Sequence, residues 1–226
     1  MKKLFIEKSQ INANKIKLNT EQINHIRALR LDKVIICDGE FDYDCDVIEK
    51  QLIVNNKNIA QGELGYDLTL YICCPKGDKL KNVVEIATEL GATKIVPVIS
   101  EYVQLNIATI NKKYEKLSKI AYEAAGLAGR GSIPEILKPI SFEKIFENNE
   151  RIILAYEKES KNKIKPASVK NDRLGVVVGS EGGFSLEEVL FAEEKGAEIV
   201  SLGERILKVE VAVANILSVV IHTKGL

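Results

Sequence analysis

The sequence of 226 residues contains no tryptophan, a single methionine, two histidines and four cysteines. So few histidines leave little material for a zinc site or for a Cys–His nucleophile, and we expect no metal centre. None of the cysteines forms a C-x-x-C pair, and Cys73 and Cys74 lie in an apolar run. We therefore expect Cys37, Cys45, Cys73 and Cys74 to be buried structural thiols.

Membrane and export signals are also missing from the sequence. No apolar run approaches the roughly 20 residues that are needed to span a bilayer. Lys2 and Lys3 are followed by only Leu4–Ile6 before charge returns at Glu7, which is unlike a secretory signal. These absences predict a cytoplasmic protein without a membrane partner.

The chain has no net charge, because 32 basic residues balance 32 acidic ones. Nucleic-acid binders usually have a basic excess, so the composition argues mildly against such a partner. It does not exclude one, since a basic face can be balanced by an acidic face. With 46% hydrophobic residues, the chain has enough apolar material for one large domain or two smaller ones.

The first part of the chain reads as short strands with one helix. Thr20–Leu31 has apolar residues at near-helical spacing, whereas Phe41–Ile48 alternates apolar residues with aspartates, as a half-buried strand does. Asp38-Gly39, just before this strand, is typical of a hairpin turn. We predict a small β-rich domain of barrel type over residues 1–68.

Strands alternate with helices over residues 69–226. Leu68–Cys74 is a continuous apolar run, typical of a strand that is buried on both faces, and Leu80–Leu90 has one apolar face. Further strands are expected at Lys94–Ile99, Arg151–Ala155, Gly175–Val178 and Glu198–Leu202. Further helices are expected at Ile110–Ala124, after the capping box that Ser185 and Glu188 form, and at Val209–His222. The alternation predicts an α/β domain whose mostly parallel sheet is covered by helices on both faces.

A glycine-rich segment, Val176–Ser185, runs from a strand into a helix with the sequence V-V-V-G-S-E-G-G-F-S. Glycines there let a ligand approach the backbone closely, and exposed N–H groups can hold a carboxylate or a phosphate. The general nucleotide motifs G-x-G-x-x-G and G-x-x-x-x-G-K-[ST] are missing, and Ser180 does not stand in G-x-S-x-G. By itself this segment is equally compatible with a tight turn that binds nothing.

A second segment, Ser201–Ala212, again runs from a strand through a glycine into a helix, with the sequence S-L-G-E-R-I-L-K-V-E-V-A. Ile206 and Leu207 stand between charged residues, which is unusual for a surface loop and suits contact with a flat ring such as adenine. The same pair could instead pack into the core while the charges face water. The segment alone does not decide between the two.

Taken together and in this order, the two segments resemble the closing motifs of the RsmE family of the SPOUT superfamily, G-P-E-G-G-[FW]-[ST] and L-G-x-R-I-L-R-x-E-T-A. Gly179–Ser185 matches the first motif and Leu202–Ala212 matches the second. The resemblance extends over nearly the whole chain, through His25–Arg30, Ala87–Gly91, Pro97–Glu101, Ala121–Ala125, Arg130 and Pro134–Ile136.

This resemblance implies a SPOUT α/β domain with a C-terminal trefoil knot, a PUA-like N-terminal β-barrel that binds RNA, and a homodimer. It also implies S-adenosyl-L-methionine as cofactor and methylation of uridine N3 in the 16S ribosomal RNA of the small ribosomal subunit. The cofactor residues that it implies are Leu154, Val178, Gly179, Glu181, Gly182, Gly183, Leu202, Gly203, Ile206, Leu207 and Ala212.

Methylation at N3 requires removal of the N3 proton and stabilisation of the anion that develops on the uracil. Orientation of the base and a nearby cation can both lower this barrier. The resemblance points to Arg130 and Lys208 as catalytic cations, and to Glu210 as an orienting or proton-accepting carboxylate. Arg27, Arg30 and Arg205 are the expected RNA-binding residues, although each of these charges could also be a solvated surface group.

The sequence departs from the family pattern mostly on the expected RNA and catalytic side. Where the family reads A-A-E-Q-S-x-R, Ala124–Arg130 keeps only the two alanines and the arginine. Ser180 replaces proline, Lys208 replaces arginine and Val211 replaces threonine. These changes leave open a divergent paralogue that acts on another RNA, and a non-catalytic RNA-binding or ribosome-assembly protein. An unrelated α/β nucleotide-binding enzyme is disfavoured by the missing nucleotide motifs.

Overall fold

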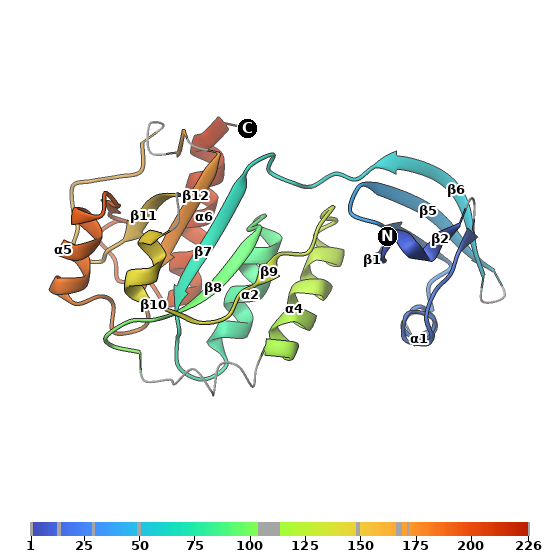
Figure 1. The fold of residues 1–226 in the computed structure, drawn as a ribbon, viewed down its shortest axis with the longest axis horizontal. Coiled ribbons are helices and arrows are strands. Elements are labelled where there is room, and N and C mark those ends of the chain that lie inside the picture. The colour runs from blue at the N-terminus through green and yellow to red at the C-terminus, as the bar shows by residue number, and fades with distance from the viewer. Residues whose placement is uncertain are drawn as a thin grey trace. The chain divides into compact units, whose positions relative to one another are not determined.

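A computed structural model describes residues 2–12, 15–28, 30–48, 51–103, 114–147, 150–165, 169–170 and 172–225. Contacts between Cα atoms divide the chain into two units (Figure 1). The first unit contains Met1–Glu63 and Tyr122–Ile133, and the second contains Leu64–Ala121 and Pro134–Leu226.

The segment Tyr122–Ile133 differs from the predicted domain division, because the sequence pattern assigned it to the second domain. In the structure the Phe5 N–H donates to the Tyr122 hydroxyl at 3.2 Å. Gly126 lies so close to Lys3 that a Cβ at this glycine would be 2.5 Å from the Lys3 carbonyl oxygen. The segment therefore packs in the first unit through contacts with the N-terminal strand, which a local pattern cannot reveal.

The first unit is built around a sheet in the order β1-β4-β5-β6, in which β1 is parallel to β4 and the other pairs are antiparallel. Its elements are β1 (Lys3–Phe5), η1 (Lys8–Gln10), β2 (Ile11–Asn12), β3 (Lys15–Ile16), α1 (Thr20–Ala28), β4 (Lys33–Cys37), β5 (Phe41–Ile48) and β6 (Gln51–Ile59). Tyr43 and Cys45 of β5 are buried, whereas the three aspartates that alternate with them are only partly buried, which confirms the predicted alternation.

The second unit contains a parallel sheet in the order β10-β8-β7-β12-β11-β13, with β9 pairing with β8. Its strands are β7 (Asp67–Cys73), β8 (Lys94–Ile99), β9 (Glu135–Ile136), β10 (Ile140–Ser141), β11 (Arg151–Ala155), β12 (Arg173–Val178) and β13 (Glu198–Val200). Its helices are α2 (Lys79–Glu89), α4 (Tyr114–Leu127, which ends in the first unit), η2 (Phe142–Glu147), α5 (Leu186–Glu194) and α6 (Val209–Gly225). Ile110, the expected start of α4, lies outside the described residues.

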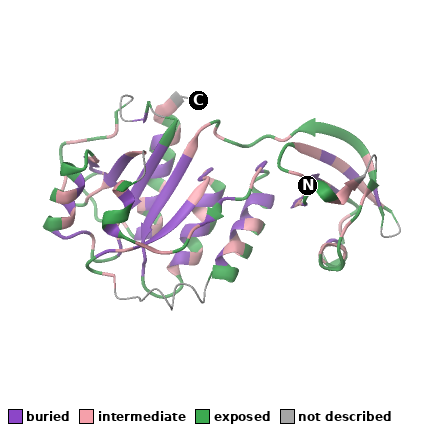
Figure 2. Ribbon diagram, in the orientation of Figure 1, coloured by how far each residue is buried: buried purple, intermediate pink, exposed green. Residues whose placement is uncertain are grey.

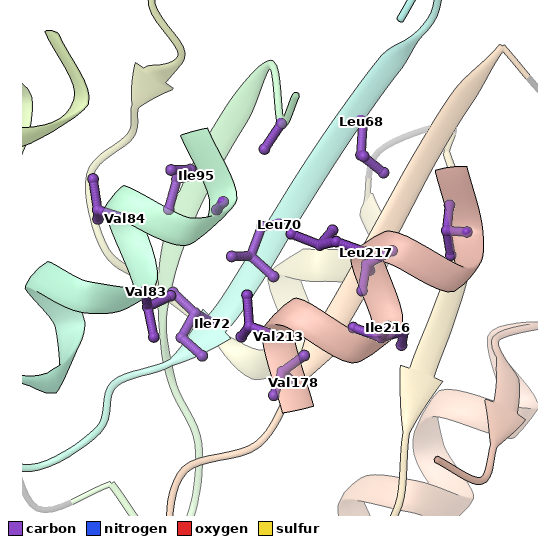
Figure 3. Close-up of a cluster of buried hydrophobic side chains, with 14 of the residues drawn as sticks. Leu68, Leu70, Ile72, Val83, Val84, Ile95, Val178, Val213, Ile216 and Leu217 are labelled. Carbon is purple, nitrogen blue, oxygen red and sulfur yellow. The ribbon is translucent and has the colours of Figure 1, made fainter. Parts of the chain in front are cut away.

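Both faces of this sheet are covered, as the continuous apolar run in β7 predicts. On one face, Leu70 and Ile72 of β7 pack against α2 and against Val213 and Leu217 of α6 (Figure 3). On the other face, Tyr71 and the residues that share its side of the sheet pack against η2 and α5. The strands at the centre of the sheet are accordingly buried along most of their length (Figure 2).

The loop that follows β11 forms hydrogen bonds with the last strand, β13, and with the C-terminal helix, α6. The Tyr156 N–H donates to the Val200 carbonyl at 3.0 Å, and the Ser201 N–H donates to the Asn162 carbonyl at 2.7 Å. Lys224, near the end of α6, donates to the Val169 carbonyl at 3.2 Å. The C-terminal part of the chain is thus bound to a loop that precedes it by tens of residues, through the end of β13 and the end of α6.

All four cysteines are buried thiols, as expected. Burial raises the pKa of the Cys37 and Cys45 thiols to about 11 and that of Cys73 to about 12. Such thiols remain protonated at neutral pH and are poor nucleophiles. In the part of the chain that the structure describes, no helix is both long enough and apolar enough to cross a membrane.

Candidate functional site

A pocket of about 260 Å³ lies at one edge of the second unit's sheet. It is formed by the segments that follow β11, β12 and β13, which are neighbouring parallel strands. Carboxyl ends of parallel strands meet at one edge, which is where open α/β sheets bind ligands. The lining residues are Lys79, Ala155, Tyr156, Glu157, Val178, Gly179, Ser180, Glu181, Gly182, Gly183, Phe184, Leu202, Gly203, Arg205, Ile206, Leu207, Lys208, Val209 and Ala212.

The first glycine segment makes a tight turn on one side of the pocket, in which the Gly183 N–H donates to the Ser180 carbonyl at 3.0 Å. Gly183 has a φ of +67°, a conformation that favours glycine. Gly179 is crowded, since a Cβ there would lie 3.1 Å from the Phe184 ring. After this turn, Ser185 opens α5 with the predicted capping box.

The carboxylate of Glu157 lies directly against Gly183. A Cβ at Gly183 would be 2.7 Å from one carboxylate oxygen of Glu157 and 2.9 Å from the other. The absence of a side chain at Gly183 therefore lets this carboxylate reach the lining of the pocket. It contributes a hydrogen-bond acceptor with negative charge beside the backbone of the glycine turn.

Glu181 is tied to the start of α2 on the rim of the pocket. Its carboxylate accepts a hydrogen bond from Lys79 at 2.7 Å and bonds from the Lys76 N–H at 3.2 Å. Partial burial alone would raise the pKa of Glu181, but the bonds from Lys79 and Lys76 outweigh it and hold this pKa below its ordinary value. Glu181 is therefore an ionised group that fixes the glycine turn.

The second segment presents apolar and cationic side chains to the pocket. Gly203 has a φ of +108°, and its N–H donates to the Ser201 hydroxyl at 3.2 Å. Ile206 is 80% exposed although it is a large apolar residue, and it lines the pocket together with Arg205 and Lys208. Because water solvates an apolar side chain poorly, this exposed isoleucine is suited to cover an apolar ring.

The sequence matches a family model described as RNA methyltransferase domain over residues 62–221. It is 30% identical to ribosomal RNA small subunit methyltransferase E of Bacillus subtilis, over 97% of this chain and 96% of that protein. It is 35% identical to the enzyme of the same name from Rickettsia conorii, over 64% of this chain and 60% of that protein. The chain belongs to the RsmE family.

Similar structures include a Legionella pneumophila protein solved in complex with S-adenosylmethionine. Its sequence is 25% identical, the match covers 96% of each chain, and the TM-score is 0.81. The sequence matches confirm the family that the paired motifs predicted, and the structural match confirms the predicted SPOUT-type α/β fold class.

The pocket brings together the residues that the RsmE motifs identify as cofactor-binding, with one exception. Leu154 does not line it and is fully buried in the core on the α5 face of the sheet. Successive side chains of a strand point to opposite faces, so Ala155, the next residue of β11, lines the pocket instead. The assignment of Leu154 to the cofactor site stays a prediction.

Of the expected RsmE catalytic and RNA-binding residues, Lys208 and Arg205 line the pocket. Glu210 lies in the first turn of α6, and one of its carboxylate oxygens is buried without a hydrogen-bond partner among the described residues. Arg27 and Arg30 are exposed in the first unit.

Arg130 lies in the first unit, and only 2% of its surface is exposed. Its guanidinium donates to both carboxylate oxygens of Glu63, through Nε at 3.1 Å and Nη2 at 2.6 Å. The same carboxylate accepts the N–H groups of Gly131 and Ser132 at 3.0 and 3.1 Å. Arg130 and its two neighbours in sequence thus bind the same carboxylate, which fixes the segment that follows α4. The motif that contains Arg130 did not predict this structural role.

Several lining residues were not predicted. Ser180 and Phe184 stand inside the quoted RsmE motif and could have been included on that ground. Tyr156 and Glu157 directly follow β11, so their position at a strand end was an available signal. Lys79 carries no local signal, because it comes from α2, which is far from the two glycine segments in the sequence.

Proposed function

We propose that this member of the RsmE family transfers the methyl group of S-adenosylmethionine to uridine N3 in the 16S rRNA of the small ribosomal subunit. The observation that carries the proposal is the pocket between the two glycine segments, at the carboxyl ends of β11, β12 and β13. An enzyme with this substrate works where ribosomes are assembled, which places it in the cytoplasm.

The residues of the pocket fit each part of S-adenosylmethionine. Ile206 and Leu207 provide an apolar surface for the adenine ring. The carboxylate of Glu157 suits the ammonium or hydroxyl groups, and exposed N–H groups of the glycine-rich segment suit the carboxylate of the cofactor. When bound, the cofactor supplies a methyl group activated by the positive charge of its sulfur.

The protein must also help uridine to lose its N3 proton. Glu210 is the candidate for orienting the base or for accepting this proton, because one of its oxygens lacks a partner among the described residues. The pKa of Lys79 is raised, first by its bond to Glu181 and also by the negative charge of Glu210. Since Lys79 lines the pocket, the charge of Glu210 acts close to the pocket.

Lys208 is the candidate cation for the anion that develops on the uracil, since it lines the pocket and is exposed. One preorganised charge contact of this kind typically contributes about 2.7–4 kcal/mol, or roughly 10²–10³ in rate. Arg205 beside it would contact the RNA backbone, and Arg27 and Arg30 of the first unit would add phosphate contacts away from the reacting base.

The outer face of α6 is the proposed surface of a homodimer. Four apolar residues of α6 are buried on one side of the helix, namely Val213, Ile216, Leu217 and Val220. Val211 and Val219 are exposed on the same helix, which is therefore apolar on more than one side. A helix of this kind needs a second buried partner, and a second copy of the chain supplies one.

Methyl transfer from tritiated S-adenosylmethionine to unmethylated small-subunit RNA, followed by mass spectrometry of its nucleosides, tests the proposal. We expect label in N3-methyluridine alone. Label in another nucleoside would favour a divergent paralogue that acts on a different target. Cofactor binding measured by calorimetry without any transfer would favour a non-catalytic RNA-binding or ribosome-assembly protein, and would overturn the proposed activity.

A further inference from the structure

Tyr102 lies beside the glycine turn of the pocket, in the short segment that follows β8. Tyr102 is 46% exposed, so part of its ring is available for contact with a ligand. A Cβ at Gly182 would be 2.8 Å from the Tyr102 Cβ and 3.3 Å from its Cγ. The missing side chain at Gly182 thus allows the tyrosine to lie against the turn while part of it remains open to solvent.

The backbone around Tyr102 is fixed from both sides. The Val103 N–H donates to the Ser100 carbonyl at 3.0 Å, which closes a turn over Tyr102. The Glu101 N–H donates to Glu188 Oε1 at 2.9 Å, and Glu188 Oε2 accepts the Ser185 N–H at 3.0 Å. Glu188 therefore ties the turn that carries Tyr102 to the end of the glycine segment that lines the pocket.

We propose that Tyr102 is a stacking platform for a base of the RNA substrate at the edge of the cofactor pocket. The inference rests on the proposed function, since it requires an RNA to be brought to this pocket. Unpaired RNA bases are commonly held by stacking on aromatic side chains. A ring placed on a fixed turn loses little freedom when a base stacks on it, so its position favours binding.

Three variants of the 226-residue chain test this role, with unmethylated small-subunit rRNA made by transcription as the probe. Tyr102→Ala should lower kcat/KM for the RNA by roughly 5- to 150-fold, the range expected for loss of one base–aromatic stack. Tyr102→Phe should retain activity close to wild type, because stacking does not need the hydroxyl. Tyr114→Ala is the matched control, as Tyr114 is 40% exposed at the start of α4.

Cofactor affinity separates stacking from a merely structural role. The dissociation constant for S-adenosylmethionine should stay within about twofold in Tyr102→Ala, because one stacked base is not part of the cofactor site. An equal loss of cofactor and RNA affinity would assign Tyr102 to supporting the glycine turn, and unchanged kcat/KM would exclude stacking; either result overturns the proposal. If the wild type transfers no methyl group, the proposed function fails, and the RNA affinities of wild type and Tyr102→Ala still decide the stacking role.

Discussion

Replacement of Gly183 by alanine tests how the glycine turn holds the cofactor. The φ of +67° at this position is left-handed, and a residue with a Cβ pays about 1–2 kcal/mol to adopt it. The new methyl group would also stand 2.7 Å from the Glu157 carboxylate, which must move away. Gly183→Ala should therefore lower both the stability of the protein and its affinity for S-adenosylmethionine.

The size of the affinity loss follows from the interaction that Glu157 provides. A hydrogen bond to a charged group contributes about 1.5–3 kcal/mol, so its loss should raise the dissociation constant by roughly 10- to 150-fold. Glu157→Gln should reproduce part of this loss without the backbone strain. Calorimetric titration with S-adenosylmethionine measures both variants.

Gly196 provides a control with the same strain but no ligand nearby. It follows α5 with a φ of +84°, and a Cβ there would meet no atom within 4 Å. Gly196→Ala should lose about 1–2 kcal/mol of unfolding free energy, as Gly183→Ala does, while its cofactor affinity stays unchanged. Wild-type affinity in a folded Gly183→Ala protein would refute the reasoning and remove Glu157 from the site.

Four further outcomes are expected. Gly182→Val should abolish S-adenosylmethionine binding in calorimetry, because its branched side chain would overlap Tyr102 and displace the turn; unchanged affinity in the folded variant would contradict this. Arg130→Ala should lower the unfolding free energy by up to about 3–5 kcal/mol, and Arg130→Lys should recover little, because the two hydrogen bonds to Glu63 are lost. An unchanged melting curve would contradict this structural role, and reduced methylation by a stable variant would point instead to catalysis. Burial alone would raise the pKa of Glu63, but its bonds with Arg130 and neighbouring N–H groups hold this pKa below the ordinary 4.5. Ionised Glu63 therefore stabilises the folded protein fully above pH 4.5, and this stabilisation is lost as the pH falls through the lowered pKa. Glu63→Gln should remove this acid-side loss from urea denaturation curves. Light scattering should give twice the chain mass of 25.1 kDa, with Val211→Asp shifting it toward one chain; a monomeric wild type would refute the dimer.

The sequence by itself determined the features that depend on local order along the chain. Alternation in Phe41–Ile48 predicted a half-buried strand, and the continuous apolar run Leu68–Cys74 predicted one that is covered on both faces. The capping box at Ser185 was predicted from residues three positions apart. The paired motifs identified the family. All the expected cofactor residues except Leu154 line the pocket, because they lie in two short contiguous stretches of the sequence.

Only the tertiary structure decided which distant residues meet. The sheet order places β12 between β7 and β11, and this arrangement brings Glu157 to Gly183. The turn after β8 brings Tyr102 to Gly182, and Arg130 finds Glu63 across 67 positions of sequence. No local period or propensity encodes such contacts, because they arise from the packing of whole elements against one another. For the same reason, the return of residues 122–133 to the first unit was visible only once the chain was folded.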